Sequence, residues 1–68
     1  MEAKEILEQI THHQNVFGYG ARRYKDDPKL ASQFLFELYD YVVSTPKEMK
    51  EYLGEKVFEE IRMFCTKN

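Results

Sequence analysis

The sequence lacks the features that would place the chain in an oxidising compartment or in a membrane. Cys65 is the single cysteine, so no disulfide can form within the chain, and a lone thiol is typical of reducing compartments. No stretch approaches the roughly 20 apolar residues that span a bilayer. The charged segment from Met1 to Ile10 lacks the apolar run of a signal peptide. We therefore expect a cytoplasmic protein without a membrane partner.

The chain also has little net charge and few residues typical of linkers. Ten basic against twelve acidic residues leave a net charge of −2, which predicts no strong field toward a polyion. Three glycines and two prolines form no linker or low-complexity tract. The 68 residues, 43% of them hydrophobic, therefore predict a single helical domain over 1–68. Its core should be thin, because a domain of this size buries only about 60% of its unfolded surface.

Helical periodicity predicts an all-α protein, a compact three-helix bundle with helices over about 3–17, 28–43 and 46–66. The apolar face of the first helix carries Ala3, Ile6, Leu7, Ile10, Gln14 and Phe17. Gly18 is placed to end this helix as the residue after its C-cap. The conformation of residues 18–27 stays open, as a further helical turn or a loop.

The second predicted helix begins with an Asp27 cap and Pro28 in the first helical position. Its main apolar arc comprises Leu30, Ala31, Phe34, Leu35, Leu38, Tyr41 and Val42. Phe36, Tyr39 and Val43 widen that arc to roughly 240° of the circumference. A helix with so wide an apolar arc either lies between the other two helices or meets another chain.

The third predicted helix begins with a capping box, in which the Thr45 hydroxyl accepts from the Glu48 N–H. Its apolar face comprises Met49, Leu53, Val57, Phe58, Ile61, Phe64 and Cys65. The periodicity stays in phase across Gly54, which favours one continuous helix. A break at Gly54, giving four helices, is the alternative.

No motif indicates catalysis, a metal or a cofactor. His12 and His13 are neighbours in sequence, about 100° apart on a helix, and cannot share one metal ion; we expect His12 in solvent and His13 at the border of the core. The glycines of Gly18-Tyr19-Gly20 follow a helix, whereas a dinucleotide fingerprint follows a strand. Cys65 has no neighbouring base and is expected as a small apolar filler. We therefore expect no enzyme, no bound small-molecule substrate and no pocket large enough for one.

Two surfaces remain as candidate sites. Phe36, Tyr39 and Val43, together with Tyr19 and Tyr24, could form an aromatic protein interface, unless the neighbouring helices cover them. Arg22, Arg23, Tyr24 and Lys25 could instead contact nucleic acid, although Asp26 and Asp27 adjoin them. A structural role for these arginines, such as capping the end of the first helix, is the alternative.

The hypothesis that follows is a small protein-interaction module: a regulator, adaptor or inhibitor that presents a helical aromatic surface. A homodimer would bury the flank at Phe36 and repair the thin core. The alternative is a nucleic-acid-binding accessory protein that uses residues 22–25.

Overall fold

The computed structural model describes residues 2–67, which fold into five helices with no strand in that range. The helices are α1 (Ala3–Ile10), α2 (Val16–Tyr24), α3 (Pro28–Ser44), α4 (Pro46–Leu53) and α5 (Glu55–Lys67). The all-α prediction is confirmed. The predicted count of three or four helices is wrong for two reasons: the last predicted helix is divided at Gly54, and the first ends at Ile10 and is followed by a separate helix, α2.

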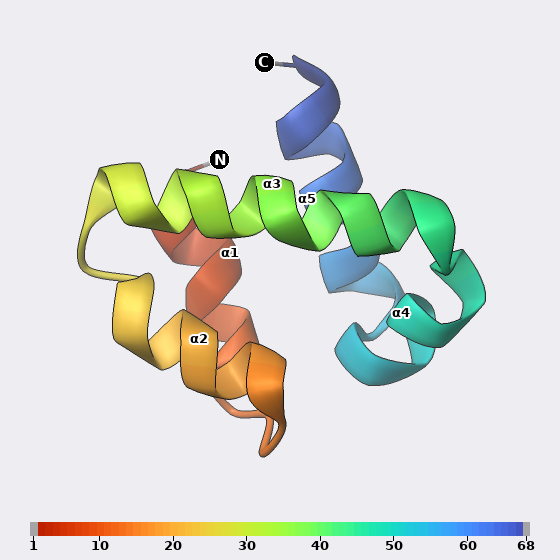
Figure 1. Ribbon diagram of the computed structural model, residues 1–68, viewed down its shortest axis with the longest axis horizontal. Coiled ribbons are helices and arrows are strands. Elements are labelled where there is room, and N and C mark those ends of the chain that lie inside the picture. The colour runs from red at the N-terminus through yellow and green to blue at the C-terminus, as the bar shows by residue number, and fades with distance from the viewer. Residues whose placement is uncertain (1, 68) are drawn as a thin grey trace.

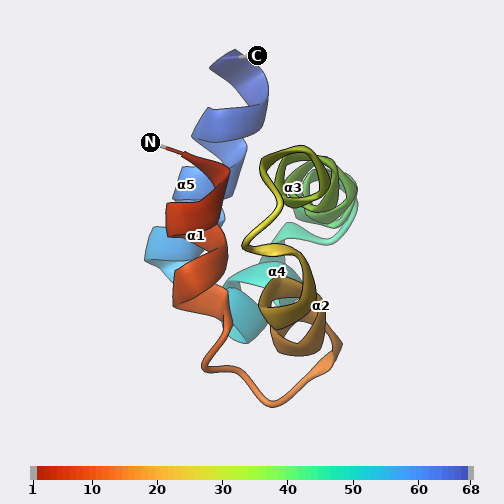
Figure 2. The same ribbon diagram turned by 90° about the vertical axis from the view of Figure 1, so that its left-hand side faces the viewer.

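The long helix α3 organises the molecule. It contacts all four other helices and crosses α1 and α5, which pack against each other behind it (Figures 1 and 2). The helices α2 and α4 lie below the two halves of α3 in Figure 1. This arrangement in two layers gives a flattened shape of 28 × 28 × 17 Å.

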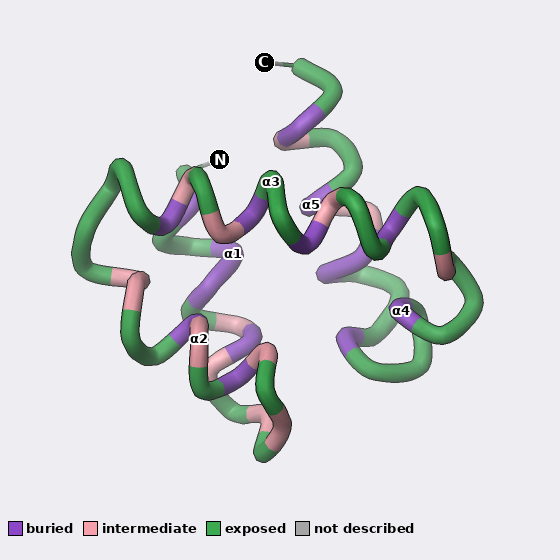
Figure 3. Tube along the Cα trace, viewed as in Figure 1, coloured by how far each residue is buried: buried purple, intermediate pink, exposed green. Residues whose placement is uncertain are grey.

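One cluster of apolar side chains forms the core between these layers (Figure 3). All five helices contribute, α2 through Ala21. The largest fully buried side chains come from the other four helices and are Ile6, Leu7, Ile10, Leu35, Leu38, Met49 and Ile61. No polar or charged residue is buried among residues 2–67. The core is therefore held by apolar packing, with polar groups confined to the caps and the surface.

The first predicted helix, 3–17, is wrong in its second half. The helix α1 ends at Ile10, and α2 begins at Val16 after an Asn15 N-cap. The Asn15 side chain accepts hydrogen bonds from the N–H groups of Phe17 and Gly18, both at 3.1 Å. Gly18 therefore lies in the first turn of α2 instead of ending α1, and the open segment 18–27 is mostly helical.

Close packing explains why α2 contains two glycines, Gly18 and Gly20. A Cβ atom on Gly18 would lie 2.0 Å from the backbone oxygen of His13, and one on Gly20 would lie 2.5 Å from the Phe34 ring. The glycines of the Gly18-Tyr19-Gly20 segment thus let α2 approach the 11–15 loop and α3. Neither has the positive φ that a helix-ending glycine often adopts.

The start of α3 agrees with its prediction. The Asp27 carboxylate accepts from the N–H groups of Lys29 and Leu30, at 3.1 and 3.2 Å, and Pro28 occupies the first turn. The helix buries Ala31, Leu35, Leu38 and Val42. Leu30 and Tyr41, which the sequence placed in the main apolar arc, are exposed, because α2 and α4 cover only part of that side.

The predicted capping box of the last helix is absent. The Thr45 hydroxyl makes no N-cap bond and donates instead to the Tyr41 carbonyl oxygen at 3.1 Å. The chain breaks at Gly54, as in the alternative prediction, with φ of 88°. The Gly54 N–H closes α4 on the Lys50 carbonyl, and the Gly54 carbonyl accepts from Phe58 in α5. One residue therefore ends one helix and starts the next.

Candidate interaction surface

Phe36 and Val43 are exposed on one flank of α3. Phe36 is 43% exposed and Val43 is 61% exposed, whereas Tyr39 on the same flank is half-buried and packs against the core. The Phe36 ring lies 6.1 Å from the Phe64 ring of α5. We call these three residues, Phe36, Tyr39 and Val43, the Phe36 edge.

The structure places Tyr19 and Tyr24 away from the Phe36 edge. The Tyr24 ring packs at 5.7 Å from Phe34, on the opposite flank of α3 from Phe36. Tyr19 is 61% exposed and points outward from α2, with the Arg22 guanidinium 4.8 Å from its ring. The five residues of the predicted protein interface therefore belong to three separate places on the surface.

The basic segment 22–25 lies in the last turn of α2 and just after it. Arg22 donates to the carbonyl oxygens of Thr11 and His13, which follow the end of α1, and so has the capping role considered as an alternative. The Arg23 guanidinium lies 5.9 Å from the ring of Tyr24. Of the four residues predicted to contact nucleic acid, Arg22 is thus engaged within the chain and Tyr24 packs on Phe34.

A second aromatic surface lies on the other flank of α3, and the sequence reasoning missed it. The Phe17 ring of α2 contacts the Tyr41 ring of α3 and the Tyr52 ring of α4, each at a centroid distance of 6.0 Å. Both tyrosines are 53% exposed, and the neighbouring Val16 is 70% exposed. We call Phe17, Tyr41 and Tyr52 the tyrosine cluster.

One sequence pattern could have indicated that these two tyrosines are exposed. Tyr41 follows Glu37 by four residues, and Tyr52 follows Glu48 by the same spacing. Residues at this spacing share one helix face, so each tyrosine lies on the same face as a glutamate. Glutamates are rarely buried, so a helix face that they share favours exposed tyrosines.

A small recess adjoins the tyrosine cluster. It has a volume of about 110 Å³, comparable with the about 150 Å³ cavity that can hold benzene. Its lining comes from the last turn of α2 and the first half of α3, namely Tyr24, Leu30, Gln33, Phe34 and Glu37. Glu37 connects the two features, since it lines the recess and precedes Tyr41 of the cluster by one turn of α3.

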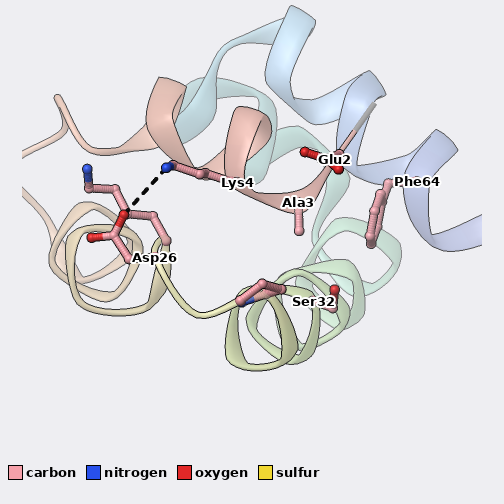
Figure 4. A pocket seen from close by; sticks show the side chains of 8 residues that line it. Glu2, Ala3, Lys4, Asp26, Ser32 and Phe64 are labelled. Carbon is pink, nitrogen blue, oxygen red and sulfur yellow. Dashed lines mark ion pairs between the residues drawn. The ribbon is translucent and has the colours of Figure 1, made fainter.

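A larger pocket of about 470 Å³ lies where the ends of several helices meet (Figure 4). It contradicts our expectation that the chain has no pocket of this size. The lining includes Ala3, Ser32 and Phe64, with the Lys4 ammonium 3.7 Å from the Asp26 carboxylate at its rim. That ion pair is well exposed, and the Asp27 side chain already caps the start of α3. The pocket is thus a gap between helix ends without a buried polar group.

The remaining reactive side chains have structural surroundings. Cys65 is buried, its thiol donates to the Leu35 carbonyl oxygen at 3.6 Å, and desolvation together with Asp40 raises its pKa to about 11. A thiol so protonated is a poor nucleophile. His12 is exposed and His13 half-buried, as expected, in the loop after α1.

The part of the chain that the structure describes has neither a metal-ligand cluster nor a helix that could span a membrane. Within residues 2–67, no three His, Cys, Asp or Glu side chains gather as metal ligands. None of the helices in this range has the length and apolarity that a membrane span requires. Comparison with known protein families, curated proteins and solved structures found no match to the chain.

Proposed function

We propose that this chain is a small non-enzymatic protein-interaction module that presents an aromatic surface along both flanks of α3. The supporting observation is the exposure of large apolar side chains on one helix: Phe36 at 43%, Tyr41 at 53% and Val43 at 61%. Single exposed apolar residues are ordinary on protein surfaces. Here they lie beside further aromatic rings, so that each flank of α3 offers a patch.

The residue types on these flanks are those that carry binding energy in protein interfaces. Phenylalanine and tyrosine bury a large area and lose little side-chain entropy on binding. In most interfaces a few such anchors account for most of the affinity. A domain with a thin core also gains stability from a partner that binds only its folded state. A regulator, adaptor or inhibitor would use the chain in this way.

Affinity capture tests the proposal. The tagged chain and its double variant Phe36→Ser/Tyr41→Ser are used to capture proteins from cells that make it naturally, with mass spectrometry of what is retained. We expect at least one protein bound by the original chain and lost with the double variant. A matched control, Lys29→Ser on the same helix, should retain it. Equal capture by all three chains contradicts the proposal.

Folding of the variants is checked before capture. Exposed substitutions usually change the free energy of unfolding by about 0.5 kcal/mol or less, although Phe36 also contacts Phe64. Far-ultraviolet circular dichroism and a urea titration show whether the double variant remains folded. If it unfolds, Tyr41→Ser alone replaces it.

A homodimer is the self-binding form of the proposal. Sedimentation velocity from low to high micromolar concentration distinguishes it, because a homodimer predicts a concentration-dependent rise in mass that Phe36→Ser abolishes. A monomer at every concentration excludes this form and leaves a different protein as the partner.

A further inference from the structure

The helix α2 differs from the other four helices in how it is attached to the core. The large side chains that are fully buried come from α1, α3, α4 and α5, whereas α2 buries only Gly18 and Ala21. The two α2 side chains that pack against the core, Phe17 and Tyr24, are half-buried. A helix that buries so little apolar area gains little free energy by docking. The core therefore holds α2 less firmly than any other helix.

The side-chain hydrogen bonds of α2 stay within its own part of the chain. The Arg22 guanidinium donates to the carbonyl oxygens of Thr11 and His13, just before the helix. In the described part of the chain, no side-chain hydrogen bond joins α2 to α3, α4 or α5. The ion pair between Lys4 and Asp26, just after α2, is well exposed and adds little stability. The polar contacts of α2 therefore do not fasten it to the core.

The sequence of α2 gives it little helical stability of its own. The helix has nine residues, and isolated helices of fewer than about 12 residues are marginal in water. Gly18 and Gly20 weaken it further, because glycine is, after proline, the least favourable residue inside a helix. Once it leaves the core, α2 should therefore lose its helical structure, so that undocking and unfolding occur together.

The helices before and after α2 are also held together without it. The helix α1 packs against α3 and α5, and the Gln9 amide donates to the Glu60 carboxylate of α5 at 2.5 Å. The helix α3 packs against α5 as well, and there the Cys65 thiol donates to the Leu35 carbonyl oxygen at 3.6 Å. Departure of α2 therefore leaves α1 and α3 joined directly and through α5.

We propose that α2 is a lid: together with the adjoining loops, over residues 12–26, it opens as one unit while the other four helices stay folded. The open form lacks the tyrosine cluster, because Phe17 moves away with α2. It also uncovers the Phe34 ring, against which Tyr24 packs in the closed form. The position of α2 therefore decides whether the molecule presents this cluster. The opening requires no partner, so it stands apart from the proposed function.

Native-state amide hydrogen exchange on the isotope-labelled full chain, followed by NMR at low urea concentrations, tests the proposal. The amides bonded within α2, over residues 19–25, should share one opening free energy. We expect their protection to be at least about tenfold lower than that of the core amides of α3 and α5. It should also depend less on urea, because opening of the lid exposes less surface than complete unfolding.

The helix α4 is the internal control for this measurement. It is as short as α2, with eight residues against nine, but it buries Met49 and Leu53. We therefore expect the α4 amides to exchange together with the core. If α4 is protected as weakly as α2, burial of large side chains does not decide which helix opens, and the proposal is overturned.

Two variants separate opening of the lid from complete unfolding. Ile61→Val trims a fully buried side chain of α5 and should lower core protection about fivefold. The same variant should leave α2 protection within about twofold, because Ile61 stays buried when the lid opens. Phe17→Leu removes the ring that contacts Tyr41 and Tyr52. It should lower protection of α2 and of the core alike, about fivefold, since either opening breaks these contacts.

A single opening free energy shared by α2 and the core overturns the proposal, and so does an equal response of both to Ile61→Val. Protection that declines residue by residue along α2 overturns it too, because that indicates fraying of the helix instead of one unit. Any of these results leaves the proposed function standing. Failure of partner capture, in turn, leaves the lid standing, because amide exchange is measured on the chain alone.

Discussion

The two places where a predicted helix breaks differ in what holds the break. Between α1 and α2 the break spans residues 11–15 and is built from contacts: Asn15 caps α2, Arg22 binds carbonyls of the loop, and Gly18 packs against His13. Between α4 and α5 the break is Gly54 alone, with φ of 88° and nothing within 4 Å of an added Cβ. The first break is held by contacts between side chains and backbone, and we call it the packed break. The second depends only on the backbone conformation of Gly54, and we call it the local break.

The largest expected effect tests the packed break. In Gly18→Ala the new Cβ meets the backbone oxygen of His13, which cannot move without shifting the loop. We expect a loss of about 3 kcal/mol in the free energy of unfolding, at the upper end for overpacking. Because a core this small supplies only about 3–5 kcal/mol, much of the chain should be unfolded in water. A urea titration followed by circular dichroism measures this.

Gly20→Ala is the matched control two residues along. The three atoms nearest its new Cβ all belong to the Phe34 ring, the far end of a side chain and not backbone. We expect a loss of about 1 kcal/mol in the free energy of unfolding, the lower end of the range for overpacking. Equal losses at both positions would show that the approach of α2 to the 11–15 loop is looser than described.

The next effect tests the local break. Gly54→Ala forces an L-residue into a conformation that favours glycine, at a cost of about 2 kcal/mol in the free energy of unfolding. No contact changes, because the added Cβ has open space. The measurement is the urea midpoint at constant m-value. A neutral result would mean that α4 and α5 join into one straighter helix, as the periodicity first predicted.

A smaller effect concerns the cap of the packed break. Asn15→Ala removes an oxygen that accepts from two N–H groups of α2 and should cost about 1 kcal/mol. Thr45→Ala is the control, because the Thr45 hydroxyl makes no N-cap bond to α4. Thermal unfolding of the two variants should give a lower midpoint for Asn15→Ala. The reverse order would contradict the assignment of the caps.

The smallest expected effect concerns Arg22. Arg22→Gln removes the guanidinium donors to the Thr11 and His13 carbonyl oxygens. Because the site is exposed, water can donate to these oxygens in their place. We expect a loss of about 0.5 kcal/mol in the free energy of unfolding. Amide hydrogen exchange should become faster at residues 11–15 and change little elsewhere. Unchanged exchange in this loop would show that Arg22 does not hold it.

Periodicity predicted the buried faces better than it predicted the helix axes. In the first predicted helix the residues assigned to the core through Ile10 are buried, and in the last one Met49, Leu53, Val57 and Ile61 are buried. The last face stays apolar across its break at Gly54, because the core continues even where the axis turns. The first face ends at Ile10, since Gln14, which was predicted on it, is exposed and Phe17 is half-buried. Spacing of apolar residues reports which side chains are covered, and it does not report whether the backbone between them is straight.

The candidate surface was predicted only in part. The apolar excess of the middle helix correctly indicated exposed side chains at Phe36 and Val43. It placed Tyr41 in the core, because a helical wheel cannot tell which flank lacks a neighbour. Tyr52 was missed, since its closeness to Tyr41 depends on α4 and α3 meeting at Phe17.

Local signals in the sequence predict the helical class, the start of α3 at Asp27 and Pro28, and most of the core, because caps and periodicity act within a few residues. Three features follow only from the packing of the helices: the break at 11–15, the need for glycine at positions 18 and 20, and the tyrosine cluster. These depend on atoms far apart in the chain approaching one another, such as the Phe17, Tyr41 and Tyr52 rings. No local pattern carries that information, because it arises from how five short helices fit around one core.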